Sequence, residues 1–546
     1  MLAVAVAVVA SWFIWTYFRQ IFTRSPLDRI PGPALKDSFQ YGHLKRLLAP
    51  DGWGFLEYLT DSYPGIAKLA GPFGHRSLYV FDPLALHNII VKEQNIFEEN
   101  DFFFTLNNML FGPGLLSTNG DKHKKQRKLL NPVFSIAHMR RMIPIFNKVT
   151  HQLVQALEAR VDVKASSTEI DVVQWMGRTA LELIGQAGLG VSFDPLVADK
   201  ADELAETIKE FQPAMSDLAF VHRLLIEIPG FAKMSRDWIR RVCRLIPLPA
   251  AHKVNLFTDR LEQSSLDIWR AKKAALARGD DAMAREVGEG KDLMSILLRE
   301  NMGAKEEDKL PEEDLIAQMN TFTFAAMDTT SNALSLTLTR LSENPDVQQK
   351  LREEILEALD DRQDLDYDEL NKLPFLDAVC RETLRLHAPV PLLFRVNRED
   401  AVLPISRPIQ CTDGTEVREI PVPKGTAVIL GLWSSNRNKA LWGEDAAEWK
   451  PERWLAPLPE TIVDAKVPGV YSNLMTFNGG GRSCIGFKFS QLEMKVVLCL
   501  LLSKFTFAPS DKRITWNLAG VVFPTVAGGG SHPSMPMKLA RYKPRA

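Results

Sequence analysis

Cysteine is scarce in this chain: five cysteines are spread over 546 residues, and no two of them form a Cys-x-x-Cys pair. That spacing excludes a disulfide scaffold and an ordinary zinc ribbon, and it is typical of a reducing compartment. An excess of charge of one sign is also missing, because 66 Lys and Arg residues balance 67 Asp and Glu residues. A nucleic-acid-binding protein normally needs a strongly basic face, so we predict no nucleic-acid partner.

Long uncharged runs are equally rare, and Leu2 to Phe18 is the exception. A run of about 17 residues is at the short end for a membrane-spanning helix. Interface aromatics stand near its end and Arg19 and Arg24 follow it, which favours a cytosolic position for the rest of the chain. A cleaved signal peptide would need a basic n-region and a small-residue cleavage site, and neither is present. We expect residues 1–19 to form an uncleaved transmembrane signal anchor; a buried core helix is the alternative.

Proline and hydrophobic periodicity divide the remainder into a hinge and a helix-dominated body. Pro26 and the run Ile30-Pro31-Gly32-Pro33 predict a stiff, non-helical hinge within residues 20–36. The body, residues 37–546, has no internal repeat. Strands are expected near 65–92 and 396–430, and amphipathic helices near 136–160, 168–188, 198–220, 314–341, 345–359, 375–386 and 487–502.

The most informative motif runs from Phe477 to Gly486 and places Cys484 in a glycine-rich loop before an apolar helical run. A thiolate at a helix N-terminus is stabilised by the helix dipole and free amides, so Cys484 is a candidate metal ligand. The glycines would let the backbone lie against a bulky planar ligand. Arg482 could bind a carboxylate on the rim of that ligand. An inert core cysteine on a tight turn is the alternative.

The order Phe-x-x-Gly-x-Arg-x-Cys-x-Gly resembles the haem-binding loop of the cytochrome P-450 superfamily. The resemblance implies haem b as cofactor, Cys484 as axial ligand of its iron, Phe477 packed over the sulfur, and Gly480 and Gly486 in the haem-binding loop. It also implies a mainly α fold, with a large helical catalytic domain over residues 37–546 and a small β-rich lobe. The chain is most similar in character to fungal, basidiomycete-like microsomal members, which implies a single-pass protein of the endoplasmic reticulum membrane.

Glu382-Thr383-Leu384-Arg385 is the only Glu-x-x-Arg in the chain. Its spacing puts both charges on one face of the expected helix, where such pairs are common and weakly stabilising. Pro451-Glu452-Arg453-Trp454 follows before the cysteine loop, and this order resembles the buried Glu-Arg-Arg triad of the family. The resemblance implies a structural triad of Glu382, Arg385 and Arg453.

Ala325-Ala326-Met327-Asp328-Thr329-Thr330 interrupts an apolar helical run with polar residues, which can bend a helix. A packing irregularity is one interpretation. The other follows from a resemblance to the family's Ala-Gly-x-Asp-Thr-Thr, with alanine at position 326 where glycine is usual. It implies a dioxygen-binding groove beside Ala325, with Asp328 and Thr329 as the proton-delivery pair.

The run from Gly120 to Lys128 is densely basic. A solvated helix face is the default interpretation, and a nucleic-acid or nuclear-targeting patch is the speculative one. The family usually has Trp four residues before an Arg here, both contacting a haem propionate. This chain keeps Arg127 and has His123 in place of Trp, and an imidazole N–H can also donate to a propionate. Arg395 aligns with another propionate contact, so Arg127, Arg395 and Arg482 would neutralise two carboxylates.

The resemblance also implies electron supply from NADPH through cytochrome P-450 reductase, with cytochrome b5 as a further partner. Basic residues on the thiolate side could dock an acidic reductase, or they could be merely solvated. The candidates are Lys124, Lys128, Lys488 and Lys495.

A thiolate-ligated haem implies a monooxygenase that inserts one oxygen atom from O2 into a C–H bond. The expected substrate-facing residues are nearly all apolar, which favours a lipophilic small molecule. A triterpenoid such as lanosterol suits them; fatty acids, xenobiotics and a haem-thiolate isomerase that does not use O2 are alternatives. The pocket candidates are Phe102, Phe324, Val390, Leu392, Leu393, Val522 and Phe523.

Overall fold

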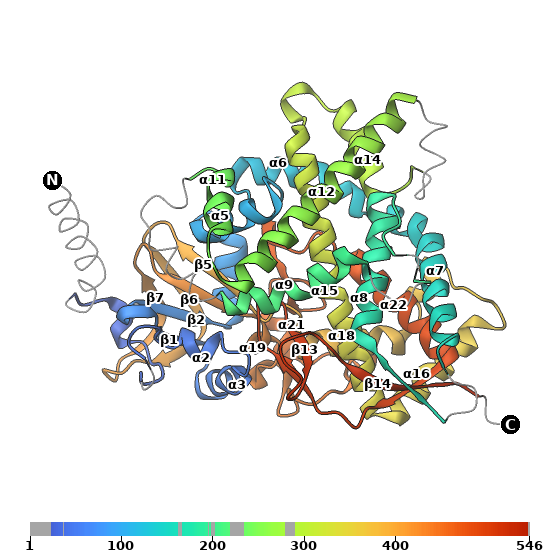
Figure 1. Cartoon of the computed structure of the whole chain (residues 1–546). Coiled ribbons are helices and arrows are strands. Elements are labelled where there is room, and N and C mark those ends of the chain that lie inside the picture. The colour runs from blue at the N-terminus through green and yellow to red at the C-terminus, as the bar shows by residue number, and fades with distance from the viewer. Residues whose placement is uncertain are drawn as a thin grey trace.

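A computed structural model describes residues 23–35, 38–161, 166–194, 196–197, 202–218, 234–278 and 290–543. These residues form a mainly helical body with small β-sheets, as Figure 1 shows. The expected anchor, residues 1–19, lies outside the described residues. Within the described ranges, no helix combines the length and the apolar character needed to cross a membrane.

Helices supply most of the body. The longer ones are α3 (Trp53–Ser62), α5 (Asp101–Phe111), α6 (Gly120–Leu130), α7 (Ile136–Glu158), α8 (Val172–Leu183), α9 (Glu203–Asp217), α11 (Arg236–Arg244), α12 (Pro249–Arg278), α14 (Leu293–Gly303), α15 (Glu312–Glu343), α16 (Pro345–Leu359), α18 (Pro374–Leu386) and α22 (Phe487–Lys504). Short helices are α2 (Leu44–Leu47), α4 (Pro83–His87), α17 (Tyr367–Asn371), α19 (Leu432–Asn436), α20 (Lys439–Trp442) and α21 (Glu460–Ala465). Single 3-10 or π turns are η1 (Pro26–Arg29), η2 (Pro72–Gly74), η3 (Asn88–Lys92), η4 (Asn131–Phe134), η5 (Ile184–Leu189), η7 (Glu306–Asp308), η8 (Pro451–Leu455) and η9 (Gly480–Arg482).

Helix α15 runs through the middle of the body, where it packs against α8, α12, α18 and α22 (Figure 1). Its first turn carries Glu312, Glu313 and Asp314, which favour the positive end of the helix dipole. Most of its later side chains are buried, polar ones included, so this helix forms the centre of the main core.

The β-rich lobe lies at the left of Figure 1 and is built on a five-stranded sheet in the order β1-β2-β8-β5-β3. Strands β2 and β8 are parallel, with Tyr79 opposite Ile429, and the other neighbours are antiparallel. The strands are β1 (Ile66–Ala70), β2 (Arg76–Val80), β3 (Phe97–Glu98), β4 (Thr168–Asp171), β5 (Leu392–Asn397), β6 (Ala401–Gln410), β7 (Glu416–Val422), β8 (Ala427–Gly431), β9 (Gly469–Tyr471), β10 (Leu474–Gly479), β11 (Phe505–Pro509), β12 (Ile514–Asn517), β13 (Phe523–Val526) and β14 (Pro536–Arg541).

This lobe has an apolar core of its own, separate from the core of the helical body. Phe55, Tyr79, Ile429 and Trp433 are among its members. Leu392 also packs in this small core. Consecutive side chains of a strand point to opposite faces, so Leu392 and Leu393 of β5 face different surroundings.

Three local expectations were wrong. Residues 83–92 are helical rather than strand, because Asp82 caps the turn that Pro83 opens. Residues 168–171 form strand β4 before α8 begins. Within the expected non-helical hinge, residues 26–29 form the turn η1, and Ile30 is fully buried against the body.

Candidate functional site

Helix α15 lies against α22, the helix that follows the cysteine loop, because Thr330 Oγ1 donates to Ser490 Oγ at 3.2 Å. Partly exposed residues on α15 and in the loop indicate a hollow between them. On α15 the half-buried residues Phe324, Ala325, Ala326 and Thr329 interrupt a run of buried neighbours. The Cys484 side chain is exposed, and yet burial raises the pKa of its thiol. The two observations agree if its surface faces an enclosed space rather than open solvent. The Cys484 thiol and the half-buried row on α15 therefore both present surface to an interior space.

The cysteine loop is held by backbone contacts. The Cys484 N–H donates to the Phe477 carbonyl at 2.9 Å, which closes the loop between β10 and α22. The Gly481 N–H donates to Gln94 Oε1 at 3.0 Å. Gly480 has a φ of +59°, and a Cβ there would lie 2.1 Å from the Ile90 carbonyl oxygen. Packing against η3 therefore already requires a glycine at this position.

Gly486 differs from Gly480, because a Cβ at Gly486 would meet only the Phe134 ring, at 4.0 Å. Its N–H and the Arg127 guanidinium both lower the pKa of the Cys484 thiol, against the larger effect of burial. Phe477 packs edge-on against Tyr471 at 5.6 Å between ring centres. The loop thus presents the Cys484 sulfur with an N–H group and a cation beside it. Both stabilise a thiolate, as a sulfur ligand of iron requires.

Cationic side chains gather at one edge of this site. Arg482 donates to the carbonyls of Leu115 and Thr118 at 3.3 and 2.7 Å, and Arg127 donates to the Ser483 carbonyl at 2.8 Å. Arg395 is buried on β5. Burial lowers the pKa of each of these guanidinium groups, and the charge of Arg482 lowers it further in Arg127 and Arg395. Such a cluster favours anionic ligands, so the residues present fit the two propionates of a haem.

His123 lies in the same cluster, buried on α6. Burial, with Arg482 and Arg127 nearby, lowers the pKa of its imidazole to about 3. His123 is therefore neutral at physiological pH and keeps one ring N–H to donate. A cavity of about 530 Å³ opens at this edge between α6, η3 and the loop, and His123, Arg127, Gly480 and Arg482 help to line it.

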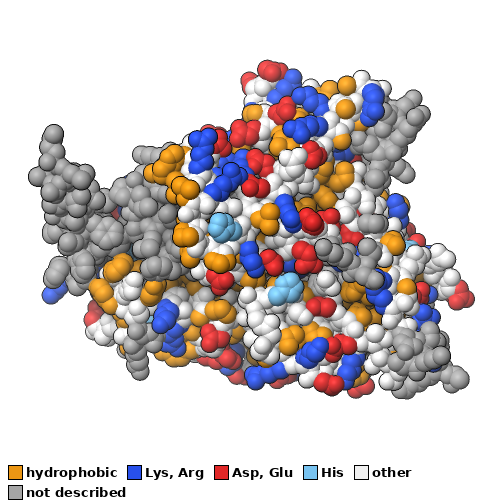
Figure 2. Space-filling model, in the orientation of Figure 1, with side chains coloured by type: hydrophobic (Ala, Val, Ile, Leu, Met, Phe, Trp, Pro, Cys, Tyr) orange, Lys and Arg blue, Asp and Glu red, His pale blue; other side chains and the backbone are white. Residues whose placement is uncertain are grey.

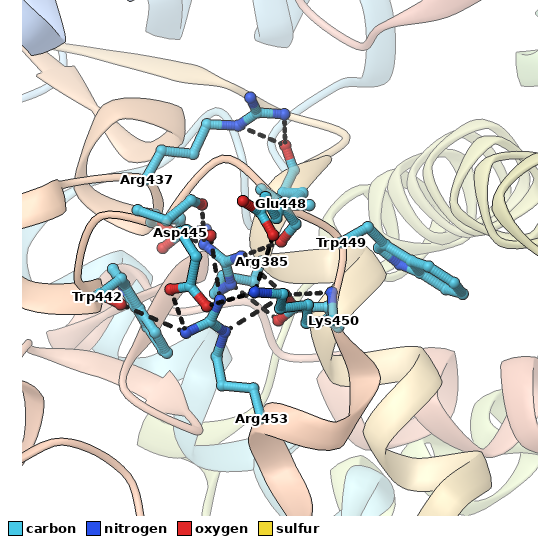
Figure 3. Close-up of polar contacts among 12 residues, drawn as sticks. Arg385, Arg437, Trp442, Asp445, Glu448, Trp449, Lys450 and Arg453 are labelled. Carbon is cyan, nitrogen blue, oxygen red and sulfur yellow. Dashed lines mark hydrogen bonds and ion pairs between the residues drawn. The ribbon is translucent and has the colours of Figure 1, made fainter. Parts of the chain in front are cut away.

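Glu382 is the centre of a buried polar network that joins α18 to the segment around η8. Both of its oxygens accept from Arg385 at 2.8 Å, and Oε1 also accepts from Arg453 Nε at 3.4 Å. The Lys450 N–H and the Trp454 indole donate to the same carboxylate at 3.0 and 2.9 Å. The structure thus brings together the three residues expected to form a triad. Figure 3 shows Arg385 and Arg453 close to Asp445 and Lys450, and Asp445 pairs with Arg453 at 3.0 Å.

This network reaches the cysteine loop through Asn436. Arg385 donates to the Asn436 carbonyl at 2.9 Å, and the Asn436 side chain bonds to the Met475 N–H and to Thr476 Oγ1, each at 2.8 Å. Met475 and Thr476 belong to β10, which leads into Phe477 and the loop. The buried charges therefore set the position of the strand from which Cys484 is presented.

Asp328 and Thr329 occupy neighbouring positions on α15 and bond differently. Thr329 is half-buried and its hydroxyl donates to the Ala325 carbonyl at 2.7 Å. Asp328 is buried and pairs with Lys209 of α9 at 3.1 Å, and Lys209 also donates to Ser331 at 2.7 Å. The helix continues unbroken through these residues. No local spacing in the sequence identifies Lys209, because its partner lies on another helix.

The pocket candidates divide by environment. The ring centre of Phe324 lies 4.9 Å from that of Phe111 and 5.1 Å from that of Phe211. The three rings together form an aromatic wall behind the hollow. Phe102, Val390 and Leu393 are half-buried, whereas Leu392, Val522 and Phe523 are buried.

The basic residues expected on the thiolate side differ in their exposure to solvent. Lys124 and Lys128 are exposed and Lys488 is half-buried. Lys495 is buried and pairs with Asp377 at 2.8 Å, so its prediction as a docking residue was wrong. Charges of both signs are interspersed over the face drawn in Figure 2.

Replacing Glu382 by Gln should destabilise the protein strongly. The change leaves the fully buried Arg385 without its ionic partner, and breaking a buried pair in this way costs about 3–5 kcal/mol. Urea unfolding followed by tryptophan fluorescence measures the loss, and Glu452→Gln is a matched control because its ion pair with Lys350 is exposed. Equal midpoints for the two variants would contradict the role of the network.

The His123 imidazole should make stability depend on pH on the acid side. Its pKa is about 3 in the folded protein against 6.5 for a free imidazole, so between these values the unfolded chain binds more protons. The free energy of unfolding therefore falls as pH drops below about 6.5. Because His138 and His387 are shifted in the same direction, His123→Gln should make this fall shallower without abolishing it. Urea titrations at several pH values measure the slope, and an unchanged slope would refute the assignment.

Comparisons with known proteins show the family to which the chain belongs. The family model described as Cytochrome P450 matches residues 54–527. The chain is 53% identical over 533 residues to cytochrome P450 monooxygenase 91 of Postia placenta, with 97% of each chain covered. It is 45% identical over 536 residues to ganoderic acid synthetase CYP5150L8 of Ganoderma lucidum, again with 97% of each covered. The chain therefore belongs to the cytochrome P450 family and is a haem-thiolate monooxygenase that is similar over nearly its whole length to basidiomycete members.

Proposed function

We propose that this protein inserts one oxygen atom from O2 into a C–H bond of a triterpenoid, with electrons from NADPH delivered by cytochrome P450 reductase. The main observation in support of this reaction is the Cys484 thiol. Its surface faces an enclosed space beside the half-buried row on α15. The substrate class rests on the relative named ganoderic acid synthetase, which is similar over 97% of both chains. An aromatic wall of Phe324, Phe111 and Phe211 suits a rigid lipophilic ring system.

The haem, when bound, supplies the activation of dioxygen, and the protein supplies its ligand, its position and the protons. Cys484 would hold the iron, and Arg127, Arg395 and Arg482 would hold the propionates. His123 would donate its ring N–H to a propionate, in the place where the family usually has Trp.

Proton delivery falls to Thr329 and Asp328. Thr329 is half-buried, and its hydroxyl donates to the Ala325 carbonyl. The hydroxyl oxygen can still accept a proton, and the O–H can turn from the carbonyl to a new acceptor. Lys209 and Ser331 hold Asp328 on the side of α15 that faces α9, and this contact keeps the carboxylate in place close to Thr329 along the helix. The half-buried apolar residues Phe324, Val390 and Leu393 would orient the substrate and exclude water.

We also propose that residues 1–19 anchor the protein in the endoplasmic reticulum membrane, with residues 37–546 as a cytosolic catalytic domain. Lys124 and Lys488 would contribute to reductase docking, because neither is buried and both flank the cysteine loop, on α6 and α22. Cytochrome b5 would be a second electron donor at the same face.

Carbon monoxide added to the dithionite-reduced protein should give a strongly red-shifted Soret band that Cys484→Ala abolishes. Loss of the Cys484 sulfur removes the thiolate ligand, while the backbone bonds of the loop can persist. Cys380→Ala is the matched control, because Cys380 is buried elsewhere, on α18. A wild-type spectrum without the band would mean another axial ligand, and the monooxygenase mechanism would be abandoned. With the band present, reductase-dependent NADPH oxidation stimulated by lanosterol would support the triterpenoid class, and stimulation only by fatty acids or xenobiotics would overturn it.

Thr329→Ala should uncouple NADPH oxidation from product formation. If its hydroxyl passes protons, removing it should lower product formed per NADPH by about tenfold and raise hydrogen peroxide. Thr330→Ala is the control, because Thr330 is buried on the same helix and its hydroxyl contacts Ser490 at 3.2 Å. Equal coupling in the two variants would rule out the relay.

A further inference from the structure

Glu99 places a carboxylate inside the arginine cluster. Its Oε1 lies 3.1 Å from Arg395 Nη2, and its Oε2 lies 3.5 Å from Arg482 Nε. The side chain is only 10% exposed, so its charge is poorly screened by solvent. One acidic side chain thus bridges two arginines that come from β5 and from the cysteine loop. No spacing in the sequence connects these three residues.

The backbone at Glu99 is fixed from the opposite side by Arg398. Arg398 Nη2 donates to the Glu99 carbonyl at 3.0 Å and also pairs with Asp101 at 2.6 Å. Strand β3 ends one residue earlier, and its Glu98 stands opposite Val396 of β5. Two anchors therefore hold this segment beside the strand that carries Arg395. The carboxylate can rotate about its side-chain bonds, but its backbone cannot move away without breaking both anchors.

Arg127, Arg395, Arg482 and Glu99 form the inner part of this cluster. The other charged side chains that line the cavity, Glu98, Lys124 and Lys128, are paired with Arg398, Asp121 and Asp308. Arg127, Arg395 and Arg482 carry three positive charges, and His123 is neutral because its pKa is about 3. Glu99 offsets one of the three, and its charge raises the pKa of Arg395 and of Arg482 against the effect of burial. The remaining two positive charges match the two propionates of the haem that the family carries.

We propose that Glu99 is a positioning residue of the haem site, which holds the side chains of Arg395 and Arg482 in place. Its negative charge also lowers the net charge of the cluster to the two positive charges that two propionates neutralise. It stays between the two arginines in the haem-loaded protein. A net charge near zero around the haem disfavours the addition of an electron relative to a positive site, so Glu99 keeps the reduction potential of the iron low. The inference rests on the cofactor and does not depend on which substrate is oxidised.

The test is a dye-mediated redox titration of haem-loaded Glu99→Gln against the wild type. Glutamine keeps the shape and one acceptor but removes the charge, so the reduction potential should rise. At a fixed ambient potential the ratio of ferrous to ferric protein should increase about tenfold, the scale of one poorly screened unit charge. Glu98→Gln is the matched control: it removes the same charge one residue away, from a side chain that pairs with Arg398. Its shift should be clearly smaller.

Haem transfer to apomyoglobin gives a second readout. Glu99→Ala removes both arginine contacts and should speed haem loss by about tenfold, the factor for ~1.4 kcal/mol. If propionates instead displace Glu99 on loading, the potential would not change in Glu99→Gln and haem loss would not accelerate, and the proposal would be overturned. Equal shifts in Glu98→Gln and Glu99→Gln would also overturn it. The carbon monoxide spectrum of the wild type separates these outcomes from failure of the thiolate assignment, and Glu99→Gln carries the test if Glu99→Ala does not fold.

Discussion

The buried carboxylate of Glu382 is the interaction on which the position of the active site depends. Five donors from α18 and the segment around η8 converge on its two oxygen atoms, and the carboxylate itself is fully buried. A buried charge with this many donors is tolerable only while each is in place, because any loss leaves an uncompensated charge. Through Asn436 the same network fixes β10, so the geometry of the cysteine loop depends on the buried charge of Glu382, about a hundred residues earlier in the chain.

The site combines three environments that need different parts of the fold. Its thiol lies at the start of α22, its polar edge combines α6, β5 and the loop, and its apolar side is formed by α15 with α5 and α9 behind it. Positive charge is concentrated where cofactor carboxylates would lie. The Lys209–Asp328 pair fits this division, since it satisfies a buried carboxylate on the helix that borders the hollow. The side of the hollow that would receive a substrate is therefore left to aromatic and small side chains.

How far the sequence predicts this structure depends on whether a feature is local. The cysteine loop, Glu382 with Arg385, and Asp328 with Thr329 are readable because each occupies one short segment. Lys209, Gln94 and Glu99 were missed because their partners are distant in sequence and no periodicity connects them. The helical turn after Asp82 was missed although the signal was present, since an aspartate followed by proline is a common helix start.

The crowding of Gly480 against the Ile90 carbonyl has a consequence for how this family can vary. Because the obstacle is a backbone atom of η3, no change of neighbouring side chains can make room for a larger residue at 480. A residue larger than glycine can stand at position 480 only if the backbone of η3 also shifts. Gly486, with only a ring at 4.0 Å, is free of that coupling on the protein side. A substitution at Gly486 can therefore change the surroundings of the sulfur without a shift of another backbone segment, on the side where α22 begins.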